Sequence, residues 1–168
     1  MEFSKLKKLG SMSLLIGCVV AIDQVSKYIA YQLLDGKGVI SLFNDCLRFL
    51  LAENRGGFLS LGASLPENVR STIFLVFTSI FLFAFFLYTL FDKHVSKYSL
   101  LASSMILGGG IGNLIDRAMR QGAVIDFVNV GIGSLRTGIF NIADMAVLFG
   151  CILLFFSLKK NDDKASES

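Results

Sequence analysis

Two aspartates, Asp126 and Asp144, lie among apolar neighbours in the stretch VIDFVNVGIGSLRTGIFNIADM, residues 124–145. If both carboxylates converge, they cannot both ionise cheaply, so they share a proton and one pKa rises. One carboxylate can then deprotonate a water while the other donates a proton to a carbonyl oxygen. This chemistry hydrolyses a peptide bond without a metal or a covalent intermediate. Either aspartate alone would be explained by a helix cap or a salt bridge, so the enzyme hypothesis depends on both together.

Other catalytic chemistries are not favoured. His94 is the only histidine and falls in a short polar turn, which disfavours Ser/His or Cys/His catalysis and a histidine-ligated zinc. Cys18, Cys46 and Cys151 show no metal-binding or disulfide spacing and are interpreted as small core residues. The chain has no phosphate-binding GxxxxGK[ST] motif and no long basic tract. We therefore expect no metal, no cofactor and no nucleic-acid partner.

Further ionisable and polar residues interrupt the apolar segments or flank them. An ionisable group inside a membrane span costs about 2.5–3.5 kcal/mol on insertion and usually has a partner. Asp23 and Lys27 are four residues apart and can pair on one helix face. A structural ion pair explains them at least as well as a direct role in chemistry. Residues 54–57, Asn-Arg-Gly-Gly, form either a turn or a polar handle for a peptide backbone.

A second polar group lies at the end of a glycine-rich segment, GGGIGNLIDR, residues 108–117. Its GxxxG step allows close approach of another helix. Asn113, Asp116 and Arg117 are spaced to share one side of the helix end. They form either a structural polar cluster that packs and anchors the helix end or a set of side chains that orients a neighbouring group. Asn141 lies about one helical turn before the second aspartate, on the same face.

The elements that must position these residues are membrane spans. The composition is 54% hydrophobic and the mean hydropathy is +0.66, which is typical of a membrane protein. Four apolar runs approach the roughly 20 residues that a span needs. They are expected at about 11–34, 71–91, 98–119 and 139–158, within a single domain over residues 1–160.

The connections between the spans differ in character. Residues 35–70 contain alternating stretches and predict a small strand-rich lobe on the membrane surface, while 121–138 can lie along the interface. Residues 161–168 are expected to be a polar, disordered tail. Four spans put both termini on one side, and the lysines at 5–8 and 93–97 favour a cytoplasmic N-terminus.

At these residues the chain resembles the bacterial lipoprotein signal peptidases (signal peptidase II). The motifs DQVSKY, Asn-x-Gly, GNLIDR, VIDF and FNIAD follow the order and spacing of that family from about residue 23 to residue 150. The resemblance implies an α-helical membrane aspartyl endopeptidase with four transmembrane helices and a small β-rich extracytoplasmic lobe between the first two. It implies that Asp126 and Asp144 are catalytic. The implied supporting or substrate-binding residues are Asp23, Lys27, Asn54, Gly56, Asn113, Asp116, Arg117 and Asn141.

The resemblance also implies a substrate and a location. Such enzymes cut diacylglyceryl-modified prolipoproteins just before the lipidated cysteine and are inhibited by globomycin-type lipopeptides. The expected location is the bacterial cytoplasmic (inner) membrane, with both termini cytoplasmic and the active site near the outer leaflet. The expected partners are the lipid-modified prolipoprotein and membrane lipids. A monomer is expected, since the four spans can pack on each other.

One stretch departs from the family pattern. Gly56 is followed by Gly57, Phe58 and Leu59, where the family usually has two small residues and then an aromatic. The bulky Phe58 leaves both aspartates intact but predicts a changed pocket shape. A specialised paralogue, or a non-catalytic one that binds lipoproteins, is therefore one alternative. A small membrane transporter or proton relay is the other, which the clustering of the acids towards the span ends disfavours.

Overall fold

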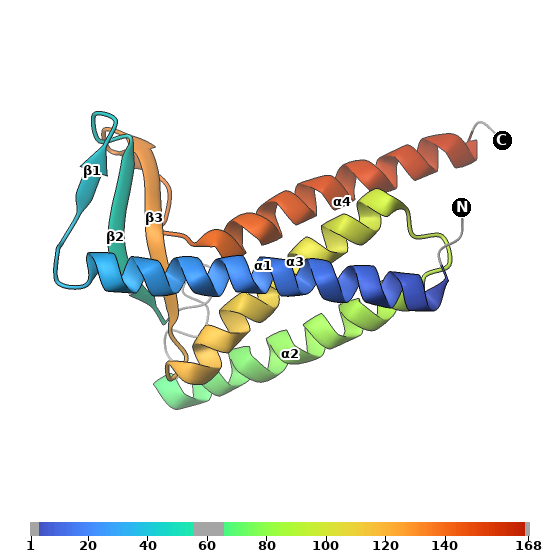
Figure 1. Ribbon diagram of the computed structural model, residues 1–168, viewed down its shortest axis with the longest axis horizontal. Helices are drawn as coiled ribbons and strands as arrows, with labels where there is room; N and C mark the ends of the chain where they lie inside the picture. The colour runs from blue at the N-terminus through green and yellow to red at the C-terminus, as the bar shows by residue number, and fades with distance from the viewer. Residues whose placement is uncertain (1–3, 56–65, 167–168) are drawn as a thin grey trace.

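The computed structural model describes residues 4–55 and 66–166, which form a bundle of four helices with a small antiparallel sheet at one end (Figure 1). The helices are α1 (Lys5–Leu34), α2 (Glu67–Phe91), α3 (Lys97–Met119) and α4 (Ile142–Ser166). The strands are β1 (Ile40–Leu42), β2 (Leu47–Asn54), β3 (Val124–Ile132) and β4 (Leu135–Arg136), in the order β1-β2-β3-β4. The start of α1 and the end of α4 lie at the end of the bundle opposite the sheet.

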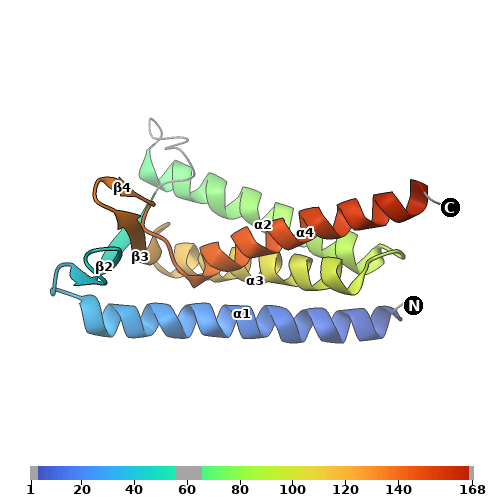
Figure 2. The same ribbon diagram turned by 90° about the horizontal axis from the view of Figure 1, so that it is seen from above.

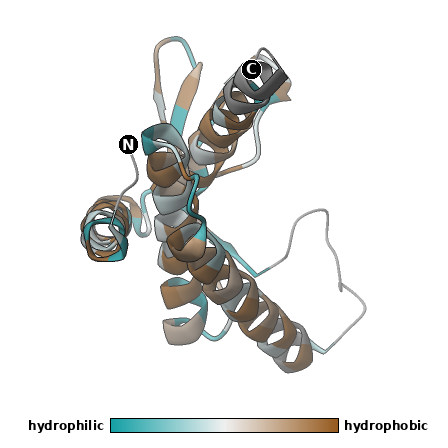
Figure 3. Ribbon diagram, turned by 90° about the vertical axis from the view of Figure 1, so that its right-hand side faces the viewer, coloured by the Kyte–Doolittle hydropathy of each residue, from teal (hydrophilic) through white to brown (hydrophobic). Residues whose placement is uncertain are grey.

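The four helices are long and apolar enough to cross a membrane, which confirms the predicted four spans. Hydrophobic residues extend along the helices (Figure 3), and large apolar side chains such as Phe77 and Phe155 are exposed on them. Such surfaces fit contact with lipid tails. Ser4 and Ser96 cap α1 and α3, each accepting a backbone N–H from the first turn of its helix.

Helix α3 is the centre of the bundle and packs against each of the other three helices (Figure 2). Its glycines make this close packing possible. A Cβ on Gly109 would overlap the backbone oxygen of Ala143 in α4, and one on Gly112 would lie 2.5 Å from the Asp23 Oδ2 in α1. The glycine-rich sequence therefore allows both α1 and α4 to approach α3 closely.

The sheet draws its strands from two connections that are far apart in sequence. Strand β1 pairs with β2, and β2 pairs antiparallel with β3, from Leu47 opposite Val130 to Asn54 opposite Val124. The predicted strands between the first two helices are present as β1 and β2, and residues 124–136 add β3 and β4, which were not predicted. Pairing with β2 satisfies the backbone of this segment, which the sequence alone suggested would lie along the interface.

Two further expectations differ from the structure. Helix α4 continues to Ser166, so residues 161–166 are helical where a disordered tail was expected. Cys18 and Cys151 were expected in the core, but both are exposed, and Cys46 is half-buried. In a membrane span, small apolar residues fit the lipid-facing surface as well as the core, so composition does not separate the two positions.

Candidate active site

Asp126 on β3 and Asp144 in the first turn of α4 come together where the sheet meets the helix ends, and Asn141 contacts both. The Asn141 side-chain Nδ2 donates to Asp126 Oδ1 at 2.7 Å. Its backbone N–H donates to Asp144 Oδ2 at 3.1 Å. One residue thus supplies a donor to each carboxylate and fixes their relative position.

Asp144 is held by the way that α4 begins. Asn141 precedes the helix, and its Oδ1 accepts the backbone N–H of Asp144 at 2.9 Å. Together with the Asn141 N–H donated to Asp144, this is a reciprocal capping box. These hydrogen bonds anchor the half-buried Asp144 at the N-terminus of α4.

Asp126 lies in a different environment, with only 2% of its surface exposed. Asn54 Nδ2 at the end of β2 donates to its Oδ2 at 3.0 Å. Burial raises the pKa of Asp126 to about 6, the charge of Asp144 adds to this shift, and hydrogen bonds from Asn54 and Asn141 oppose it. The environment therefore allows Asp126 to keep its proton up to a pH of about 6, higher than an ordinary aspartate does.

A buried cation, Lys27, lies behind the two aspartates. Its Nζ is 2.8 Å from Asp23 Oδ2 and 2.9 Å from Asp116 Oδ2, and it donates to Asn113 Oδ1 at 2.9 Å. All of these ionised side chains are at least 97% buried. The pairing of Asp23 with Lys27 is confirmed, while Asp116 joins it from another helix.

Each carboxylate paired with Lys27 also holds the backbone next to one of the two aspartates. Asp116 Oδ2 accepts the N–H of Ile125, the residue before Asp126, at 3.1 Å. Asp23 Oδ1 accepts the N–H of Ala143, the residue before Asp144, at 2.9 Å. The ion-pair cluster thereby fixes both β3 and the start of α4.

Two polar side chains complete the network. Asn113 Nδ2 donates to Asp144 Oδ1 at 2.9 Å, and its Oδ1 accepts from Asn141 at 3.1 Å. Gln24 was not among the predicted site residues. Its Nε2 lies within hydrogen-bonding distance of Asp116 Oδ1 at 3.1 Å and of the Gly112 carbonyl at 3.2 Å. Its position beside Asp23, as an uncharged polar residue in an apolar span, was the available signal.

The remaining predicted residues are placed less fully. Arg117 is half-buried and lies close enough to interact with the charges of Asp116, Asp126 and Asp144. Gly56 and the departure at residues 57–59 lie outside the described residues. Within residues 4–55 and 66–166, no three His, Cys, Asp or Glu side chains are grouped to hold a metal ion.

Fold and site together define a class of protein: an apolar four-helix membrane protein with paired aspartates in a buried polar network where the helices meet a small sheet. The family described as signal peptidase (SPase) II matches residues 15–160. The chain belongs to this family.

Curated relatives and solved structures agree with this assignment. The lipoprotein signal peptidase of Borrelia hermsii is 34% identical, covering 97% of this chain and 99% of the relative. The lipoprotein signal peptidase of Chlorobium phaeobacteroides (strain BS1) is 36% identical, covering 82% of this chain and 89% of the relative. A bacterial membrane enzyme solved by the in meso method at 2.3 Å resolution has a TM-score of 0.77 at 29% identity, covering 92% of this chain and 91% of that one. These similarities favour neither the non-catalytic paralogue nor the transporter.

Proposed function

We propose that this protein is an aspartic-type endopeptidase that removes the signal peptide from diacylglyceryl-modified prolipoproteins, cutting just before the lipidated cysteine. The observation that carries the proposal is the pairing of Asp126 and Asp144 through Asn141. Family membership over nearly the whole chain supports the substrate class.

The different surroundings of the two aspartates support a separate role for each. Asp144, held by Asn113 and by the start of α4, removes a proton from the attacking water. The protonated Asp126 donates to the carbonyl oxygen of the scissile bond as the water oxygen bonds to its carbon. Collapse of the tetrahedral intermediate breaks the C–N bond, and the leaving amine takes the proton that Asp144 received. The carbonyl oxygen returns its proton to Asp126.

The architecture suits an amphiphilic substrate. The aspartates lie near the sheet end of an apolar bundle, so a signal helix in the bilayer could present its end at that depth. The proposal includes a location in the bacterial cytoplasmic membrane, with both termini in the cytoplasm and the sheet at the outer leaflet. It acts as a monomer among membrane lipids and is inhibited by globomycin-type lipopeptides.

A cleavage assay tests the proposal. Purified protein in detergent is mixed with a diacylglyceryl-modified prolipoprotein, and the product is detected by its shift on a gel. Wild type is expected to cleave, while Asp126→Asn and Asp144→Asn each abolish cleavage and still fold. Asp35→Asn, an exposed carboxylate at the end of α1, is the control and keeps wild-type activity. Activity that survives in either dyad variant would refute the two-aspartate mechanism.

A further inference from the structure

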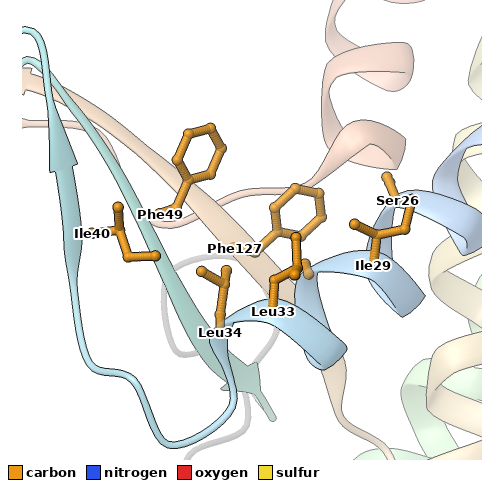
Figure 4. A pocket seen from close by; sticks show the side chains of 8 residues that line it. Ser26, Ile29, Leu33, Leu34, Ile40, Phe49 and Phe127 are labelled. Atoms are coloured by element: carbon orange, nitrogen blue, oxygen red, sulfur yellow. The ribbon is translucent and has the colours of Figure 1, made fainter.

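An apolar groove of about 350 Å³ lies between the last turns of α1 and the sheet (Figure 4). Leu33 and Leu34 line it from the helix, and Ile40, Phe49 and Phe127 line it from three strands. Ser26 supplies the one polar side chain of the lining, and its hydroxyl already donates to the Asp23 carbonyl at 2.7 Å. Such a lining suits hydrocarbon, since a polar ligand would lose its hydrogen bonds to water without replacement.

The groove continues a stripe of α1 that faces outward. Ile22, Val25, Ile29 and Leu33 follow one another at steps of three or four residues and are 59%, 57%, 48% and 55% exposed. Ile29 and Leu33 also line the groove. Since α1 is long and apolar enough to span a membrane, this stripe contacts lipid tails and leads directly into the groove.

Strand β3 separates the groove from the aspartates. Asp126 and Phe127 are consecutive in β3, so their side chains leave opposite faces of the strand. Asp126 bonds to Asn54 and Asn141, whereas Phe127 packs in one apolar cluster with Ala30 and with Leu34 of α1. A chain in the groove would therefore contact the back of the strand that carries Asp126, away from the scissile bond.

We infer that the groove binds an acyl chain of a bilayer phospholipid, which braces β3 from the side opposite Asp126. The occupant is a membrane lipid and not the lipid of the substrate, because the strand stands between the groove and the dyad. This inference depends on the membrane placement of α1 and holds whether or not the protein is a peptidase.

The chain contains no tryptophan, so a single introduced tryptophan is a clean fluorescent reporter. We would place it at Ile40, which lines the groove, and reconstitute the protein in phosphatidylcholine vesicles with brominated acyl chains. Bromine quenches tryptophan at close range. Strong quenching is expected for Ile40→Trp, greater with bromine near the head-group end of the chain than near its methyl end.

Two further substitutions, each combined with Ile40→Trp, locate the source of the quenching. Ser26→Phe places a ring in the groove and is expected to remove most of the quenching. Ile22→Phe places the same ring on the same face of α1, about one turn outside the groove, and is expected to leave it unchanged. Melting temperatures in detergent verify folding, and Leu33→Phe replaces Ser26→Phe if the latter does not fold. Equal quenching in all three proteins would place the lipid outside the groove, and absent quenching would mean a water-filled groove; either result overturns the inference.

Discussion

Asp116 accepts the backbone N–H of Ile125, the residue immediately before Asp126. Asp23 holds Ala143, before Asp144, in the same way, and Lys27 lies between these two carboxylates. A single cation therefore governs the backbone positions of both dyad aspartates, one on a strand and one on a helix.

Lys27→Met should destabilise the protein strongly and abolish cleavage. It leaves Asp23 and Asp116 buried without a cation, and removal of one partner from a buried ion pair costs about 3–5 kcal/mol. Melting temperature in detergent and the cleavage assay measure the two effects. Lys37→Met, at an exposed position after α1, is the control and should change neither. Wild-type stability in Lys27→Met would show that the cluster does not fix the fold.

Asn113→Ala should reduce the turnover rate and also lower the stability by about 1–3 kcal/mol, because Lys27 and Asn141 each lose a buried acceptor. Asn113 donates to Asp144 Oδ1, and misplacement of a catalytic group by about 1 Å can lower the rate about 100-fold. Steady-state cleavage kinetics provide the measurement. Asn129→Ala is the matched control, since the buried Asn129 donates to the Thr137 carbonyl and not to either aspartate. A variant at Asn113 that cuts at the wild-type rate would argue against its role in positioning Asp144.

Gly109→Ala and Gly17→Ala should have opposite effects on stability. A methyl group at Gly109 overlaps the Ala143 backbone, so α3 and α4 must separate, at a cost of about 1–3 kcal/mol. Gly17 in α1 has nothing within 4 Å of the new methyl group, and alanine there should stabilise the helix by roughly 0.5–1 kcal/mol. Thermal unfolding in detergent compares the two variants. Equal melting temperatures would contradict the close contact of α3 with α4.

The stability of the protein should fall as the pH rises through about 6. Asp126 has a folded-state pKa of about 6 against an ordinary value of 3.8, so the folded state binds its proton more tightly. The contribution of Asp126 to stability is highest where both states are protonated, falls between pH 3.8 and about 6 because only the unfolded state loses its proton, and levels off once the buried carboxyl also ionises. The melting temperature of wild type minus that of Asp126→Asn, measured from pH 4 to pH 8, should therefore fall with rising pH. Parallel curves would mean that Asp126 titrates normally.

The sequence singled out Asp126 and Asp144 as candidate catalytic residues and predicted the Asp23–Lys27 ion pair. Each of these signals is contained in a short motif. The i,i+4 spacing places Asp23 and Lys27 on one helix face before any tertiary contact is known. The second partner of Lys27, Asp116, comes from another helix, so no periodicity reports it. Gln24 was overlooked for the same reason, since its contacts in α3 are 88 and 92 residues away.

Strand β3 shows a different limit of sequence interpretation. Residues 124–132 are mostly apolar and contain a glycine, which fits an interfacial segment as well as a strand. Their strand conformation depends on pairing with β2, whose residues come from the other side of α2 and α3. Local preference is weak in such a case, and the tertiary partner decides.

The pairing of β2 with β3 also has a consequence for biogenesis. Asn54, at the end of β2, leaves the ribosome long before Asp126 on β3, and the two meet only after α2 and α3 have been made. Until β3 has been synthesised, the hairpin of β1 and β2 therefore has one edge without a partner strand. Asp144, in the first turn of α4, is synthesised later still. Assembly of the dyad is therefore among the last events of synthesis, and a chain still attached to the ribosome before α4 emerges lacks one of the two proposed catalytic aspartates.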